Sequence, residues 1–217
     1  MHDRDADAGV VPLEEALIVN DPAYRRRLML SMLTEEPDAY LAQLQAAKLN
    51  DDVEVAHYAA TAVAQISKES DLKLQQLERA FKTDPSAQNL NEYCDFLGEY
   101  LGSGLAEGRV AQIQRQQYAR LLARRCERED TLELRIRYAT ALADVGQIDE
   151  AQAVTDQLVL DVPEEQEVWM LCLRLAVMRR DGDEVRRVID AIDKQHVYLS
   201  ADNREKLAFW RDGEEAR

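Results

Sequence analysis

The stretch from residue 132 to residue 199 contains one helix-pair pattern written twice, with a shift of 34 residues between the copies. The first copy starts at Leu132, and the second starts at Gln166. The Asp-Glu-Ala triplet at 149–151 returns as Asp-Glu-Val at 183–185, which is the same shift. A fixed period of this length is typical of repeat architectures, in which each unit buries its apolar face against the next unit. The pattern therefore predicts stacked pairs of helices.

Helix signals continue through the rest of the chain, and no alternating pattern typical of a strand occurs. Capping residues and prolines divide the sequence into about eleven helices with short connections. Asn50-Asp51-Asp52 predicts one helix start, and Ser70 predicts the start of the following helix. Glycines at 102, 104 and 108 predict the longest irregular connection in the body of the chain.

Large and small residues in the two copies follow the spacing of tetratricopeptide (TPR) repeats, and this region resembles that family. The matching residues of the first copy are Tyr138, Ala139, Leu142, Gly146, Ala151 and Pro163. Those of the second copy are Trp169, Leu173, Ala176, Ile189 and Ile192. The copies depart from the family pattern at Arg135, Thr155, Arg180 and Val197. Residues 57–77 resemble HEAT-type units as much as TPR units.

The fold expected from these patterns is all-α, a right-handed α-solenoid of about five helix pairs (HEAT/TPR-like) with a C-terminal capping helix after Ser200. Residues 1–11 are expected to form a flexible N-terminal tail. Residues 12–212 are expected to form a single helical-repeat domain, whose clearest TPR units are 132–165 and 166–199. No linker rich in Gly, Pro or Ser divides this domain.

The net charge of −15 limits the choice of partner. Nucleic-acid binding needs a basic surface, and docking on anionic lipid is also unfavourable. No apolar run reaches the roughly 18 residues of a membrane helix, so direct membrane insertion is not expected. Three cysteines are too few and too scattered for a disulfide framework or a zinc site. A cytoplasmic location is expected, either for a soluble protein or for the soluble part of a membrane-anchored one.

Six positions in the first helices of the two TPR-like units are expected to line a concave surface and to contact a protein partner. They are Arg137, Thr140, Asp144, Met170, Arg174 and Met178. Exposed methionine suits adaptable peptide binding, although either Met side chain would serve equally well as packing between repeats.

An arginine-rich segment forms a basic island in this acidic chain. It contains Arg109, Arg115, Arg120, Arg124, Arg125 and Arg128, of which Arg115, Arg120 and Arg124 are the candidates for a basic patch. One interpretation is a dock for an acidic peptide or a phosphate. The other is a solvated helix face balanced by neighbouring glutamates.

No motif of a known catalytic class occurs, so the chain is expected not to be an enzyme and to need no cofactor or metal. Glu54 and His57 have the Glu-x-x-His spacing that di-iron bundles use, and a helical metalloprotein is therefore an alternative. A packed or surface histidine is the simpler interpretation. Oligomeric state is left open, and a self-assembling structural repeat protein is the other alternative.

Residues 11–33 and 50–63 are similar to the soluble repeat region of PelE-type proteins of bacterial Pel exopolysaccharide synthesis. That resemblance implies a cytoplasmic module that holds membrane-bound subunits of a polysaccharide synthase together. The function expected from the sequence is a non-catalytic scaffold for protein–protein interaction.

Overall fold

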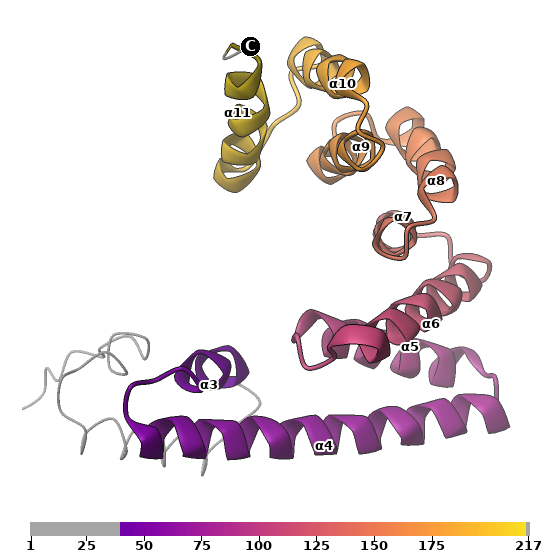
Figure 1. Cartoon of the computed structure of the whole chain (residues 1–217). Coiled ribbons are helices and arrows are strands. Elements are labelled where there is room, and N and C mark those ends of the chain that lie inside the picture. The colour runs from indigo at the N-terminus through magenta and orange to yellow at the C-terminus, as the bar shows by residue number, and fades with distance from the viewer. Residues whose placement is uncertain (1–39, 216–217) are drawn as a thin grey trace, which may run out of the picture. The chain divides into compact units, whose positions relative to one another are not determined.

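Every regular element in the described part of the chain is an α-helix (Figure 1). The computed structural model describes residues 40–215, and its helices run from α3 to α11 in chain order without a strand in that range. The prediction of an all-α chain is therefore confirmed. The tail expected over residues 1–11 lies outside the described residues. The right-handed superhelix and the number of helix pairs stay predictions.

Backbone contacts divide the chain into two units. Unit 1 contains the residues up to Pro85 together with the short segment Gly102–Leu105. Unit 2 contains Ser86–Leu101 and the residues from Ala106 onward. The expectation of one continuous domain over residues 12–212 stays a prediction. Within residues 40–215, no helix combines the length and the apolar character that crossing a membrane requires.

The described part of unit 1 is built on helices α3 (Leu41–Ala47) and α4 (Val53–Thr83). Asp52 caps α4, since its carboxylate accepts hydrogen bonds from the backbone N–H of Glu54 at 2.9 Å and of Val55 at 3.4 Å. The core between the two helices consists of Leu44, Ala47, Val55, Ala59, Ala62 and Ile66. Small residues on α4 let α3 pack closely against it, as the alanine-rich sequence indicates.

Helix α4 continues through Ser70, and the prediction of a helix break at that residue is wrong. The segment around Ser70 contains neither glycine nor proline, so nothing in its backbone forces a turn. Gln65 donates a hydrogen bond to Glu69 one turn later, just before the expected break. Buried Ile66 and Leu74 lie on the same face, so a continuous apolar stripe outweighs the local capping preference of one serine.

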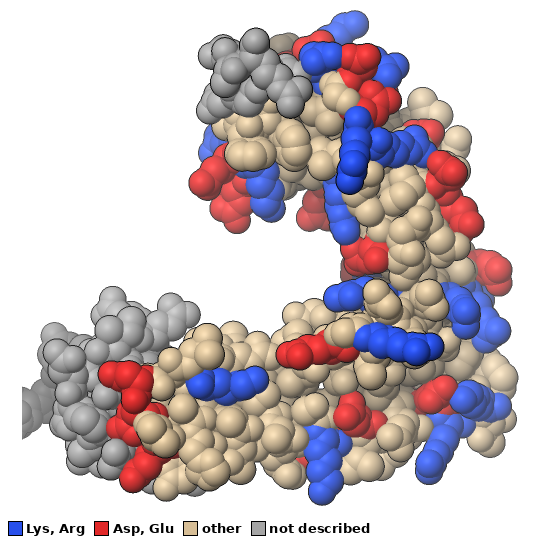
Figure 2. All heavy atoms as spheres, viewed as in Figure 1, with Lys and Arg blue, Asp and Glu red and all other residues tan. Residues whose placement is uncertain are grey.

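Unit 2 begins with helices α5 (Ala87–Gly102) and α6 (Gly108–Cys126), joined by the irregular connection that the glycines predict. The two helices approach closely at Gly98, where an added Cβ would lie 2.8 Å from the Tyr118 hydroxyl. Glycine at this position therefore makes room for the tyrosine. Figure 2 shows Lys and Arg side chains over α6, which carries five arginines and no acidic residue.

The next four helices reproduce the 34-residue period in their boundaries. Helices α7 (Leu132–Asp144) and α8 (Ile148–Asp161) form one pair, and α9 (Gln166–Met178) and α10 (Gly182–Lys194) form the next. Each start in the first pair lies 34 residues before its counterpart, from 132 to 166 and from 148 to 182. Helix α9 contacts both α7 and α8, so the second pair stacks on the first.

The turns inside the two pairs are also equivalent. Gly146 has a φ of 80° and Arg180 has a φ of 57°, and these two residues are one period apart. Each turn is closed by two backbone hydrogen bonds. In the second turn, the N–H of Arg180 donates to the carbonyl oxygen of Val177, and the N–H of Asp181 donates to that of Ala176. Arg180 thus adopts the left-handed conformation that glycine normally supplies at the end of a helix.

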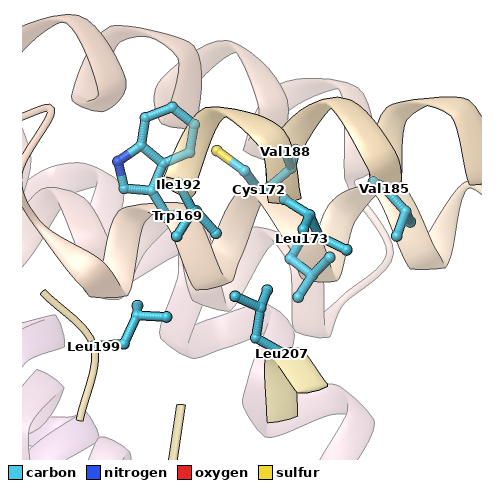
Figure 3. Close-up of a cluster of buried hydrophobic side chains, with 10 residues drawn as sticks. Trp169, Cys172, Leu173, Val185, Val188, Ile192, Leu199 and Leu207 are labelled. Atoms are coloured by element: carbon cyan, nitrogen blue, oxygen red, sulfur yellow. The ribbon is translucent and has the colours of Figure 1, made fainter. Parts of the chain in front are cut away.

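The C-terminal core joins α9, α10 and α11 (Ala201–Glu215) (Figure 3). Trp169, Cys172 and Leu173 of α9 face a row of apolar side chains on α10, and Leu207 comes from α11. Ser200 caps α11, as the sequence predicts, because its hydroxyl accepts a hydrogen bond from the Asn203 backbone N–H at 3.3 Å. This buried cluster anchors α11 to the second helix pair.

We expect Cys172 to make unit 2 sensitive to alkaline pH. Burial, helped by the Asp156 and Glu184 carboxylates, raises the pKa of this thiol from 9.0 to about 12. Above pH 9.0 the unfolded chain loses this proton while the folded chain keeps it, so stability falls as the pH rises from 9.0 toward about 12. The slope for one such group is about 1.4 kcal/mol per pH unit. Over this pH interval, the free energy of unfolding measured with urea should fall less for Cys172→Ala than for the wild-type chain. Equal falls would contradict the raised pKa of Cys172.

Candidate functional site

A groove on unit 2 is lined by helices α7, α9 and α11 and encloses about 410 Å³. Thr140 comes from α7, and α11 supplies Asn203, Lys206 and Trp210. Helix α9 supplies the remaining lining residues, which are Glu167, Met170, Leu171, Leu173, Arg174 and Val177. We call this surface the α9 groove. Its volume is in the range of pockets that hold small ligands or a few peptide residues.

The α9 groove combines an apolar floor with charged groups. Met170, Val177 and Trp210 give it flexible and aromatic apolar surface. Lys206 and Glu167 place charges of both signs at its edge. A surface of this kind holds an apolar side chain while polar groups orient the backbone that carries it.

Arg174 is held in the groove by an ion pair with Asp144. The distance from Arg174 Nη2 to Asp144 Oδ1 is 2.5 Å, and the two side chains are 43% and 39% exposed. The pair links α9 to the end of α7. Because the Asp144 carboxylate offsets the charge of Arg174, Lys206 is the groove cation without a carboxylate partner in the described residues.

Gln166 fixes the position of α11 beside α9. Its side-chain oxygen accepts hydrogen bonds from the Ser200 backbone N–H at 2.8 Å and from Asn203 Nδ2 at 3.1 Å. The start of α11 is therefore tied to the start of α9, and Leu207 is buried one turn later. The third wall of the groove is thus set by these bonds and by the C-terminal core.

The structure brings together three of the six residues expected to line a concave surface. Thr140, Met170 and Arg174 line the α9 groove, and Asp144 adjoins it through its ion pair. Met178 is 41% exposed at the end of α9 but is not among the lining residues. The sixth residue, Arg137, belongs to a separate polar network.

Arg137 links α7 to both α5 and α6. Its guanidinium donates to the Tyr118 hydroxyl at 2.9 Å and to Asp95 Oδ1 at 3.1 Å. Asp95 also accepts a hydrogen bond from Arg125 Nη1 at 2.6 Å. One carboxylate thus binds two arginines from two different helices, which holds the first three helices of unit 2 together.

Burial controls the ionisation of the groups around this network. Desolvation raises the pKa of the Tyr118 hydroxyl and of the Cys94 thiol, and the neighbouring arginines only partly oppose the effect. Both groups therefore stay protonated at neutral pH. Burial lowers the pKa of Arg125, but its hydrogen bonds to Asp95 and Cys94 outweigh that effect, so the pKa is raised overall. The chemistry of this network is therefore that of a structural contact that holds α5, α6 and α7 together.

Sequence reasoning missed the contribution of α11 to the groove. The available signal was the period itself, because Ser200 follows Gln166 by 34 residues and α11 begins one residue later, at Ala201, close to where a third unit would begin. Asn203, Lys206 and Trp210 are the periodic equivalents of Trp169, Cys172 and Ala176, which are buried in α9. Helix α11 turns this face toward the groove, which the spacing alone does not predict.

The three basic-patch candidates are all exposed on α6, but they do not share one face. Arg120 and Arg124 lie one turn apart on the same side of the helix. Arg115 is five residues before Arg120 and points about 140° away from it. Arg120 also lines a second groove of about 330 Å³, hereafter the α6–α8 groove, together with Gln116, Tyr138, Leu142, Gln147 and Glu150.

Glu54 and His57, the residues of the metalloprotein alternative, are exposed on α4. Within residues 40–215 no three His, Cys, Asp or Glu side chains lie close enough together to hold a metal ion. The pair thus has no third protein ligand in that range, whereas metal sites with dedicated protein ligands generally need three or four.

Comparison with protein-family models found no matching family, and comparisons with curated proteins and with solved structures also found no match. The resemblances to TPR repeats and to PelE-type proteins therefore stay predictions.

Proposed function

We propose that this chain is a non-catalytic helical scaffold that binds a segment of a partner protein in the α9 groove. The observation that carries the proposal is the lining of that groove by three alternate helices, α7, α9 and α11, with an apolar floor and a charged edge. Two of these helices repeat at the 34-residue period, and the third begins within one residue of the next period, at Ala201. A linear segment with one or two apolar side chains would suit this surface.

Charge supports a protein rather than a nucleic acid as the partner. The chain carries 42 acidic residues against 27 Lys and Arg, and the groove itself contains Glu167 as well as Lys206 and the paired Arg174. Phosphate backbones need a surplus of cations, which this groove lacks. The narrower proposal of a module in a Pel-type polysaccharide synthase rests on the resemblance of residues 11–33 and 50–63. Neighbouring genes for a processive glycosyltransferase would favour it.

Met170→Glu should weaken partner binding at least tenfold, because it places a charge on the apolar floor of the groove. The full chain is immobilised, incubated with native host extract, and the captured proteins are quantified by mass spectrometry. A protein retained by the wild-type chain and lost with Met170→Glu is the expected result.

The matched control is Tyr198→Glu, which introduces the same charge at a side chain that is 79% exposed before α11 and outside the groove lining. Capture should stay within about twofold of wild type for this variant, since it leaves the apolar floor of the groove intact. If both variants, folded by circular dichroism, capture the same proteins as the wild type, the groove is not the binding site.

A further inference from the structure

Charge is strongly segregated between two helices of unit 2. Helix α6 contains five arginines and no acidic residue. Helix α8 contains four acidic residues and no basic residue. The acidic character extends beyond α8, because residues 138–173 include eight Asp or Glu and no Lys, Arg or His. Figure 2 shows red side chains along the outer edge of α8 and blue ones over α6.

The outward face of α6 mixes cations with apolar side chains. Arg109, Ile113, Arg120 and Arg124 follow one another at helical spacing, so they form one stripe. Ile113 is 57% exposed, and the adjacent Val110 is 56% exposed. Arg109 and Arg120 have no carboxylate partner among residues 40–211, whereas Arg125 on the opposite face is buried and paired.

The outward face of α8 has the complementary composition. Asp149, Ala153, Asp156 and Leu160 follow one another at the same helical spacing. Leu160 is 73% exposed, which is high for a leucine in the middle of a folded unit. Asp156 accepts a hydrogen bond from the Gln152 amide, and in the described residues no cation reaches its carboxylate.

Helices α6 and α8 border one groove over α7, with these two faces beside it on the outside of each helix. The α6–α8 groove is lined by Arg120 of α6 on one side and by Glu150 of α8 on the other, and Tyr138 and Leu142 of α7 form its base. A two-fold axis through this groove would therefore bring α6 of one molecule against α8 of a second molecule, and the reverse contact would form at the same time.

We propose that the α6–α8 face is a self-association surface on which two copies of this chain form an isologous dimer. In each of its two equivalent contacts, the arginine stripe of one copy meets the acidic stripe of the other. Ile113 packs near Leu160, and Arg120 lies near Asp156. The contact buries the exposed apolar side chains of both helices and pairs Arg120 with Asp156, neither of which has an ion-pair partner in the described residues, whereas Asp149 already pairs with Arg179.

A second copy is favoured over an unrelated acidic partner because the chain carries both halves of the complementarity. An acidic ligand would pair with α6 but would leave Leu160 and Asp156 exposed. The two-fold arrangement satisfies both faces with one kind of contact. It lies outside the α9 groove, so it is independent of the proposed partner binding.

Sedimentation velocity of the full chain tests the dimer. The wild-type chain should dimerise at micromolar concentration, and raising NaCl from about 50 mM to about 500 mM should weaken the dimer because screening acts on the paired charges. Arg120→Glu and Asp156→Lys should each raise the dissociation constant at least tenfold, since each places like charges opposite one another in both contacts.

Mixing the two variants is the decisive experiment. In a mixed dimer, one contact joins the new carboxylate to the new ammonium group, and the other contact is native. Dimers should therefore reappear in the mixture, although each variant alone is monomeric. Arg204→Glu, the same charge change at an exposed position of α11, is the matched control and should dimerise like the wild type.

Three results would overturn the proposal. They are a wild-type chain that stays monomeric at about 100 μM, an Arg120→Glu variant that dimerises normally, and a mixture of the two variants that remains monomeric. An association that Arg204→Glu weakens as much as Arg120→Glu would also exclude this face.

Discussion

Replacing Trp169 by alanine should destabilise unit 2 by about 3–5 kcal/mol, the usual loss for a large aromatic side chain in a core. The indole is 5% exposed and lies in the cluster that joins α9, α10 and α11 (Figure 3). Its Nε1 also donates a hydrogen bond to the Pro163 carbonyl oxygen at 2.7 Å, which ties α9 to the turn after α8. The substitution therefore removes both packing and a buried hydrogen bond. Urea unfolding followed by circular dichroism measures the loss.

Trp210→Ala is the matched control, because the chain contains only two tryptophans and each variant leaves the other as its fluorophore. Trp210 lies at the wall of the α9 groove and is only partly buried. Its loss should lower stability by about 1 kcal/mol or less, since little core volume is emptied. Equal losses for the two variants would show that the cluster around Trp169 is not the main core of the C-terminal helices.

The helix pairs of residues 132–194 could be predicted from the sequence because their signals are local and repeated. Gly146, Pro163 and the capping residues mark ends, and the apolar positions between them fix the buried face. Helices α7 and α9 accordingly have the same length and start one period apart. Such features depend on residues only a few positions away.

Arg180 shows where reading one position at a time fails. The residue departs from the glycine of the repeat pattern, yet its φ of 57° is close to the 80° of Gly146. The two backbone hydrogen bonds that close the turn, together with the packing of α9 on α10, hold the arginine in the left-handed conformation. Stacking in the whole pair thus overrides the preference of a single residue.

The candidate site was only partly predictable for a related reason. Thr140, Met170 and Arg174 follow from the period, because equivalent positions of α7 and α9 face the same way. The contribution of α11 depends on the rotation of that helix, which is set by long-range bonds from Gln166 to Ser200 and Asn203. Contacts across about 35 residues leave no local pattern to read.

Asp95→Ala should destabilise unit 2 by about 2–3 kcal/mol, because it leaves the buried guanidinium of Arg125 without its carboxylate. The Arg125 side chain is only 10% exposed, and its Nε already lacks a hydrogen-bond partner in the part of the chain that the structure describes. The loss should fall below the range for fully buried pairs, because the Asp95 side chain is itself 47% exposed. Removing Asp95 also removes the hydrogen bond that Arg137 donates to it, which weakens the contact between α7 and α5.

The chain provides a matched control in Asp144→Ala, which breaks an arginine pair with the same spacing of 30 residues. Its partner Arg174 is 43% exposed, so water replaces the lost carboxylate and the expected loss is about 1 kcal/mol or less. Arg125→Met combined with Asp95→Ala should recover at least half of the stability lost by Asp95→Ala, because no unpaired buried charge then remains. Urea unfolding of the four chains decides the matter. Two results would contradict this explanation: equal losses of stability for Asp95→Ala and Asp144→Ala, or a double variant that is no more stable than Asp95→Ala alone. In either case the desolvation of Arg125 is not what makes the ion pair important. Apolar packing alone would then have to hold α5, α6 and α7 together.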